Sequence, residues 1–130
     1  MDLYLVAIRG GWFGVGFDKF HERKVLPHVR EHVEFVGGEE IFFRDRTIKL
    51  KGDLIRIGRS PDTNEIPLDT TDISRQHCTI TQAAGKWTIN DLGSKNGTSV
   101  NGERVTAPRE LKDGDELVLG VTTILSVMIR

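Results

Sequence analysis

The sequence lacks the features that mark secreted, membrane-bound and disulfide-stabilised proteins. Its 130 residues include a single cysteine, Cys78, so no intrachain disulfide can form, as is usual in reducing compartments. No apolar run approaches the length of a membrane span, and the opening MDLYLVAIRGG has neither the cationic start nor the apolar length of a signal peptide. We therefore expect a cytoplasmic protein that does not contact membranes.

An excess of charge of either sign is also missing. The chain has 18 lysine and arginine residues against 19 aspartate and glutamate residues, for a net charge of −1. General nucleic-acid binding usually requires a strongly basic domain, so no nucleic-acid partner is predicted. The balance still permits a small cationic pocket for one anion. A chain of this length can bury its own core, and residues 1–130 are expected to form a single domain.

Short strand-like segments, separated by turn residues, make up most of the chain. Turn signals such as Gly52, Pro61, Gly85 and the Asp113-Gly114 pair recur at the spacing of about 8–12 residues that is typical of all-β folds. This spacing predicts an antiparallel β-sandwich or barrel. The expected strands cover residues 3–8, 46–50, 53–58, 65–68, 77–81, 86–91, 98–100, 103–105, 116–119 and 123–129.

Residues 10–45 interrupt this rhythm, and we interpret them as an insertion between the first two strands. Pro27 is well placed to open a short helix within the insertion. The alternative is an N-terminal extension over residues 1–32, ahead of a domain that begins near Val33. Four aromatic residues of the segment either pack against the sandwich or form a partner-binding patch, namely Trp12, Phe13, Phe17 and Phe20.

Three polar segments adjoin predicted strands, at residues 58–60, 72–77 and 94–98. Because alternate connections of an antiparallel meander fall at the same end of the sheets, the three could share one rim. Arg59 offers a planar set of N–H donors for phosphate oxygens, Ser74 offers a hydroxyl, and Asn96 can both donate and accept. Arg75 and Lys95 add positive charge, although a solvated position is an alternative for both. The set suits one phosphate group held on a peptide.

Two Asn-Gly pairs lie close together, and we assign them different roles. Asn-Gly is the strongest short hairpin signal, yet only Thr98, Ser99 and Val100 separate Asn96-Gly97 from Asn101-Gly102. We interpret Asn101-Gly102 as the hairpin turn between short strands at 98–100 and 103–105. Gly97 permits a tight backbone on the rim, where the Asn96 side chain is expected to face the ligand.

Taken in order, these segments resemble the forkhead-associated (FHA) domain, a phosphothreonine-binding module. The resemblance covers about residues 46–130 and rests on GRSPDTNEIPLD, DISRQHCTI, INDLGSKNGTSVNGERV and LKDGDELVLG. It implies an eleven-stranded antiparallel β-sandwich with the ligand on loops at one end. It also implies a partner protein phosphorylated on threonine, either a Ser/Thr kinase or its substrate, and binding without a cofactor.

The resemblance also implies a role for each motif residue. In this family the arginine after the glycine and the serine of Ser-x-x-His contact the phosphate, which points to Arg59 and Ser74. Neighbouring positions imply that Arg75 and Lys95 border the phosphate and that Asn96 holds the ligand backbone. The other motif positions are expected to be structural, with His77 buried and bracing the serine loop: Gly58, His77, Gly97, Thr98, Asn101 and Gly102.

Two rival functions compete with this one. Residues 10–45 could be the main interface of a phosphate-independent interaction or assembly module. His28 and His32 fit H-x-x-E-H, a zinc-peptidase pattern, but matches of five residues arise often by chance. We therefore predict no enzymatic activity and no metal site. Residues 1–46 contain neither serine nor threonine, so this segment cannot supply a phosphothreonine to its own domain.

Overall fold

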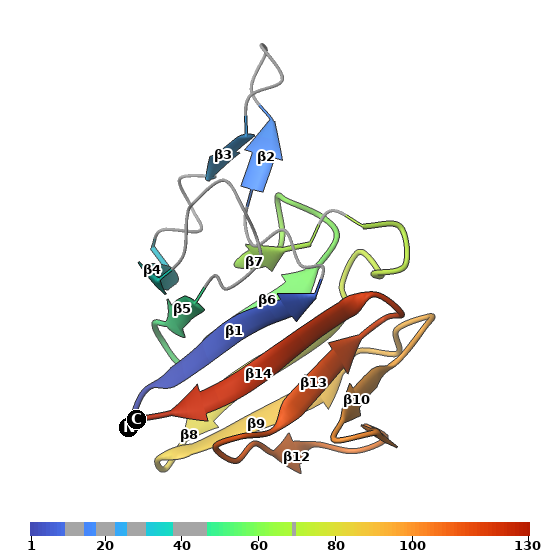
Figure 1. The fold of residues 1–130 in the computed structure, drawn as a ribbon. Helices are drawn as coiled ribbons and strands as arrows, with labels where there is room; N and C mark the ends of the chain where they lie inside the picture. Colours follow the sequence, from blue (N-terminus) through green and yellow to red (C-terminus); the bar gives the residue numbers. More distant parts are fainter. Residues whose placement is uncertain (10–14, 18–22, 26–30, 38–46, 69) are drawn as a thin grey trace.

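The computed structural model describes residues 1–9, 15–17, 23–25, 31–37, 47–68 and 70–130. Within them the fold is a β-sandwich of two sheets, with a separate two-stranded hairpin (Figure 1). The larger sheet has the order β11 (Glu103–Arg104), β10 (Thr98–Val100), β13 (Glu116–Leu119), β14 (Thr123–Ile129), β1 (Leu3–Arg9), β5 (Thr47–Leu50) and β4 (Val33–Gly37). The smaller sheet has the order β12 (Arg109–Glu110), β9 (Lys86–Asp91), β8 (Cys78–Ala83), β6 (Leu54–Gly58) and β7 (Ile66–Pro67). The hairpin pairs β2 (Val15–Phe17) with β3 (Arg23–Val25).

Alternation of apolar and polar residues explains which face of each strand is buried. In β1 the side chains of Leu3, Leu5 and Ala7 are buried, whereas those between them are half-exposed. In β9 the indole of Trp87 and the side chain of Ile89 are buried in the same way. Successive side chains of a strand point to opposite faces, so one row from each sheet builds the core between the sheets.

The predicted all-β sandwich is confirmed, and the structure adds detail to it. The described residues contain twelve strands in the two main sheets, one more than the eleven expected, and several of them are only two residues long, such as β12 beside β9. One pair departs from the antiparallel pattern, since β7 runs parallel to β6. Strand β4 falls inside residues 10–45 and was not predicted; it pairs with β5 at the edge of the larger sheet.

Several predictions on residues 10–45 lie outside the described residues. The short helix expected after Pro27 falls on residues 26–30, which are not described, and Glu31 and His32 form a turn before β4. The side chains of the four aromatic residues and His28 are likewise outside the description. The division of the chain into a domain and an insertion therefore stays a prediction, as does the alternative extension. Among the described residues we find no helical segment with the length and apolarity of a transmembrane span.

The two ends of the sandwich differ in what they present. At one end the chain termini meet, because the backbone groups of Asp2 and Arg130 exchange hydrogen bonds of 2.8 and 3.0 Å. Strands β1 and β14 then run together to the other end, where the β13–β14 turn lies (Figure 1). That turn bonds to the loops before β8 and after β9, so the loops with the polar motifs gather at the end remote from the termini.

Candidate functional site

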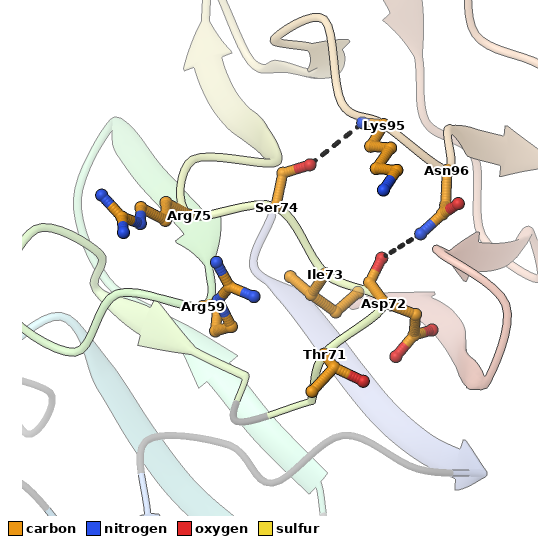
Figure 2. A pocket seen from close by; sticks show the side chains of 8 residues that line it. All are labelled: Arg59, Thr71, Asp72, Ile73, Ser74, Arg75, Lys95 and Asn96. Atoms are coloured by element: carbon orange, nitrogen blue, oxygen red, sulfur yellow. Dashed lines mark hydrogen bonds between the residues drawn. The ribbon is translucent and has the colours of Figure 1, made fainter.

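An open pocket of about 310 Å³ lies among the loops at this end (Figure 2). Its lining comes from three separate connections, after β6, before β8 and after β9: Arg59, Thr71, Asp72, Ile73, Ser74, Arg75, Lys95 and Asn96. All five residues predicted to bind the ligand are among the eight. The volume is at the small end of the range for ligand pockets, about 300–1,000 Å³, and suits one side chain better than a large cofactor.

The first two loops are held together by backbone hydrogen bonds beside Gly58. The amide of Arg59 donates to the carbonyl of Ser74 at 2.9 Å, and the amide of Ser60 donates to the carbonyl of Arg75 at 3.3 Å. A side chain at position 58 would not fit, because a Cβ there would lie 2.2 Å from the Arg75 oxygen. Gly58 therefore lets the backbone of Arg59 lie against the loop before β8, residues 70–77, which we call the serine loop.

His77 links the serine loop to the loop between β9 and β10, residues 92–97, which we call the Asn-Gly loop. Its imidazole is fully buried, and the amide of Ser74 donates to Nδ1 at 3.1 Å. Because Nδ1 accepts this hydrogen bond, the proton belongs on Nε2, which lies 2.9 Å from the Gly97 carbonyl and donates to it. One neutral ring thus joins the loop that carries Ser74 to the loop that carries Asn96.

Asp91 holds both ends of the Asn-Gly loop through hydrogen bonds to its carboxylate. Its carboxylate accepts from the Ser94 amide at 3.0 Å, the Ser94 hydroxyl at 2.6 Å and the Thr98 hydroxyl at 2.7 Å. Partial burial acts to raise the pKa of Asp91, but the hydrogen bonds from Ser94 and Thr98 outweigh it and lower that pKa. The Ser94 oxygen in turn accepts from the Gly97 amide at 3.0 Å. Thr98 was predicted to be structural, whereas Ser94 fell in the polar segment 94–98 without a role and Asp91 was missed. The D-x-x-S spacing ahead of the Asn-Gly pair was the available signal.

The two Asn-Gly pairs adopt different backbone geometry. Both Asn101 and Gly102 have positive φ, at 51° and 84°, and Val100 pairs with Glu103 across them, so this pair forms the tight turn between β10 and β11. At the other pair only Gly97 has positive φ, at 87°. The Asn96 side chain is exposed and lines the pocket.

Polar groups around the pocket are left able to bind a ligand. Ser74 Oγ accepts a hydrogen bond of 3.0 Å from the Lys95 amide, which leaves the hydroxyl proton free to donate. Figure 2 shows the Arg59 guanidinium and the Lys95 ammonium directed toward the space between them, whereas the Arg75 guanidinium is directed away. Arg59 is half-buried, and in the part of the chain that the structure describes no carboxylate pairs with it. Unpaired cations beside a hydroxyl donor form a site for an anion.

Asp72 is the one carboxylate among the described residues that line the pocket, and its charge is already satisfied. Its oxygens accept from the amides of Val121 at 2.7 Å and Thr122 at 3.0 Å, and from the hydroxyls of Thr70 and Thr122. Partial burial alone would raise the pKa of Asp72, but these hydrogen bonds lower it to about 2. Asp72 and Ile73 fall in the polar segment 72–77 but were given no role, and Thr71 was not singled out, because nothing in the local sequence shows that the β13–β14 turn lies beside them.

Metal binding and nucleophilic catalysis find no support in the described part of the chain. No group of three His, Cys, Asp or Glu side chains is placed there to hold a metal ion. His32 is half-exposed in the turn before β4, and its predicted partner His28 is not described. Cys78 is fully buried, and burial raises the pKa of its thiol, which disfavours the reactive thiolate.

Comparison with known proteins identifies similar sequences and folds. The family model described as "FHA domain" matches residues 55–120. An FHA domain-containing protein of Arabidopsis thaliana is 40% identical over 78 residues, which are 58% of this chain and 20% of that protein. The transcriptional regulatory protein EmbR of Mycobacterium tuberculosis is 40% identical over 72 residues, which are 55% of this chain and 18% of EmbR. The chain thus matches about a fifth of the length of these relatives.

Solved structures show the same fold. The solution structure of the FHA domain of a hypothetical protein from Arabidopsis thaliana superposes with a TM-score of 0.69 at 27% identity, covering 98% of this chain and 85% of that one. Mycobacterium tuberculosis EmbR, solved in complex with a low-affinity phosphopeptide, superposes with a TM-score of 0.62 at 35% identity. That superposition covers 65% of this chain and 22% of EmbR.

Proposed function

This chain belongs to the FHA domain family, and we propose that its pocket binds a phosphothreonine-containing segment of a partner protein. FHA domains are interaction modules, and a relative with the same fold has been solved with a phosphopeptide. We infer no enzymatic activity for this chain. The partner would be a protein phosphorylated by a Ser/Thr kinase, or the kinase itself, in the cytoplasm.

The observation that carries the proposal is that three loops converge on one pocket, and that the positively charged groups directed into it have no carboxylate partner among the described residues. Arg59 would hold phosphate oxygens through its planar N–H donors, and Ser74 would add a hydroxyl donor. Lys95 would add a second positive charge from the opposite loop, against a ligand charge of about −1.5 to −2. Asn96 would hold the ligand backbone through the polar atoms that its bond to Asp72 leaves free.

The five predicted site residues do not contribute equally in this proposal. Arg59 is half-buried and directed inward, so its charge is the least screened by water. Arg75 is exposed and directed away from the pocket centre, so it would act on the outer part of the ligand or from a changed rotamer. Its backbone is nevertheless essential to the loop, because its carbonyl accepts from Ser60 and from Asn64.

The test is calorimetric titration with phosphothreonine peptides selected from a degenerate library, alongside their unphosphorylated forms. We expect binding only to the phosphorylated forms. Replacing Arg59 with Ala should weaken it by roughly 2–5 kcal/mol, or tens-fold to thousands-fold in affinity, the usual effect of truncating one partner of a buried charge pair. Arg130→Ala is the matched control, because Arg130 pairs with Asp113 at the far end of the sandwich.

Two results would contradict the proposal. The first is equal binding of phosphorylated and unphosphorylated peptides, which would favour a phosphate-independent module. The second is unchanged affinity in Arg59→Ala, which would remove Arg59 from the phosphate site.

A further inference from the structure

We propose that Asp72 and Gly120 are positioning residues, which fix the Asn96 carboxamide in its ligand-binding orientation through the β13–β14 turn. Neither residue needs to touch the ligand in this role. The inference rests on the proposed function, because it assigns Asn96 to the ligand backbone. The two supporting residues lie far from Asn96 in the chain, Asp72 on its N-terminal side and Gly120 on its C-terminal side.

The Asn96 side chain is tied to Asp72 by one hydrogen bond. Its Nδ2 group donates to the backbone carbonyl of Asp72 at 2.9 Å, as Figure 2 shows. Because the Asn96 side chain is exposed, packing does not restrict its rotamers. A free side chain must be immobilised when a ligand binds, whereas a side chain already held in place loses little further entropy. The position of the Asp72 carbonyl therefore determines how well Asn96 is prepared for binding.

Asp72 is in turn held by the β13–β14 turn. Both backbone amides of Val121 and Thr122 point at its carboxylate, and the Thr122 hydroxyl lies 3.1 Å from the same oxygen. The hydroxyl of Thr70 adds a donor from the serine loop itself. Several donors on one ionised carboxylate form a strong and directional attachment. The serine loop thus depends on residues 121–122 for its position.

Gly120 lies beside both partners of the Asn96–Asp72 hydrogen bond. Its amide donates to the carbonyl of Gly97, next to Asn96, at 3.0 Å. Its missing side chain leaves room for Asp72, since a Cβ at position 120 would lie 2.7 Å from Oδ2 of Asp72 and 2.8 Å from the Asp72 carbonyl oxygen. That carbonyl is the one that accepts from Asn96. A methyl group at position 120 would therefore displace the acceptor on which the orientation of Asn96 depends.

The principal experiment compares Gly120→Ala with Gly114→Ala. Both glycines have positive φ, at 64° and 89°, so both variants carry backbone strain. A Cβ at Gly114 meets nothing within 4 Å, and Gly114 bonds to Val127, away from the pocket. We expect Gly120→Ala to weaken binding of the selected phosphothreonine peptide by about 3- to 10-fold, the loss of one ordered side chain, and Gly114→Ala to leave it unchanged.

A double-mutant cycle separates positioning from a general structural effect. In an Asn96→Ala background the side chain to be positioned is gone, so Gly120→Ala should reduce affinity by less than about 2-fold. A full 3- to 10-fold loss in that background would overturn the proposal. Asp72→Asn keeps an acceptor for the turn amides and should retain most of the affinity that Asp72→Ala loses.

The Asn96 carboxamide also gives a readout that needs no ligand. Its side-chain ¹⁵N–¹H₂ resonances should shift in Gly120→Ala and stay in place in Gly114→Ala, since the hydrogen bond to Asp72 changes only in the first. Unshifted resonances in Gly120→Ala would overturn the positioning role, even if phosphopeptide binding is confirmed. Shifted resonances without any phosphopeptide binding would instead contradict the proposed function and leave the link intact. Should Gly120→Ala not fold, Thr122→Val removes the hydroxyl bonds alone, and it should produce a smaller shift in the same resonances.

Discussion

Replacing Gly58 with Ala tests the tightest contact in the binding loops. A Cβ at this position would lie 2.2 Å from the Arg75 carbonyl oxygen, 2.8 Å from its carbonyl carbon and 2.9 Å from Nδ2 of Asn64. Ordinary contact begins near 3.4 Å, so the Arg75 backbone would have to retreat by about 1 Å. Gly58 is not among the glycines with positive φ, so the conflict arises from space and not from backbone conformation.

The expected loss of stability follows from what this retreat breaks. Overpacking a close contact costs about 1–3 kcal/mol. The hydrogen bonds at risk run from Ser60 to the Arg75 carbonyl and from Asn64 to the same oxygen, and each contributes about 0.5–1.5 kcal/mol. Alanine recovers less than about 1 kcal/mol by restricting the unfolded chain. Together these terms predict that Gly58→Ala lowers the free energy of unfolding by roughly 2–4 kcal/mol.

Urea denaturation measures this directly. With a slope of about 2 kcal/mol per molar urea, the midpoint should fall by roughly 1–2 M. Gly85→Ala is the control, because Gly85 has a positive φ of 75° but open space around its Cβ position. That variant should lose about 1–2 kcal/mol from strain alone. A midpoint for Gly58→Ala that matches the wild type, or lies above that of Gly85→Ala, would refute the argument.

Acid pH and the Asp91 cluster offer two further tests. The pKa of Asp72 is held at about 2, below its ordinary 3.8, so its contribution to stability is complete above about pH 4 and is lost as the pH falls toward 2. Urea midpoints at pH 5 and pH 2.5 should show this loss. Because the carboxylate is only partly buried and water screens its interactions, the loss should be about 1 kcal/mol rather than the full value of the pKa shift. Asp72→Asn should reduce the pH dependence, and an equal pH dependence in that variant would contradict the assignment. Asp91→Ala removes an acceptor from Ser94 and takes the Asp91 carboxylate away from the buried Thr98 hydroxyl. Calorimetric unfolding should therefore show that the free energy of unfolding falls by about 2–4 kcal/mol. Asp91→Asn should recover part of this loss. Equal melting of Asp91→Ala and wild type would show that the cluster does not stabilise the loop.

Local sequence pattern accounts for the strands that were predicted and for those that were missed. Segments such as 86–91 alternate clearly, with Trp87 and Ile89 inward, and the strand has those bounds in the structure. Strand β4 was missed because residues 10–45 were interpreted as one insertion, although the Gly37-Gly38 pair at its end is a turn signal. The parallel pairing of β7 with β6 was also missed, since a two-residue strand carries no periodicity from which direction can be deduced.

For the binding site, the identities of the residues could be predicted from the sequence, but their orientations could not. Arg59, Ser74, Arg75, Lys95 and Asn96 were identified from residue chemistry and motif order, and all five line the pocket. Their orientations were not predictable, because the direction of a side chain depends on neighbours from other loops. Arg75 points away from the pocket centre, and one N–H of Asn96 is already bonded to Asp72.

The amino-acid sequence by itself determined the alternating strands, the turn at Asn101-Gly102 and the set of donors available for an anion. These follow from interactions within a few residues, such as the freedom of glycine at positive φ and the two-residue period of a strand. Tertiary structure alone decided that the Gly120 turn meets Asp72 and that a neutral His77 joins two binding loops. Such contacts form between segments 20 to 50 residues apart, and only packing of the two sheets brings those segments within hydrogen-bonding distance.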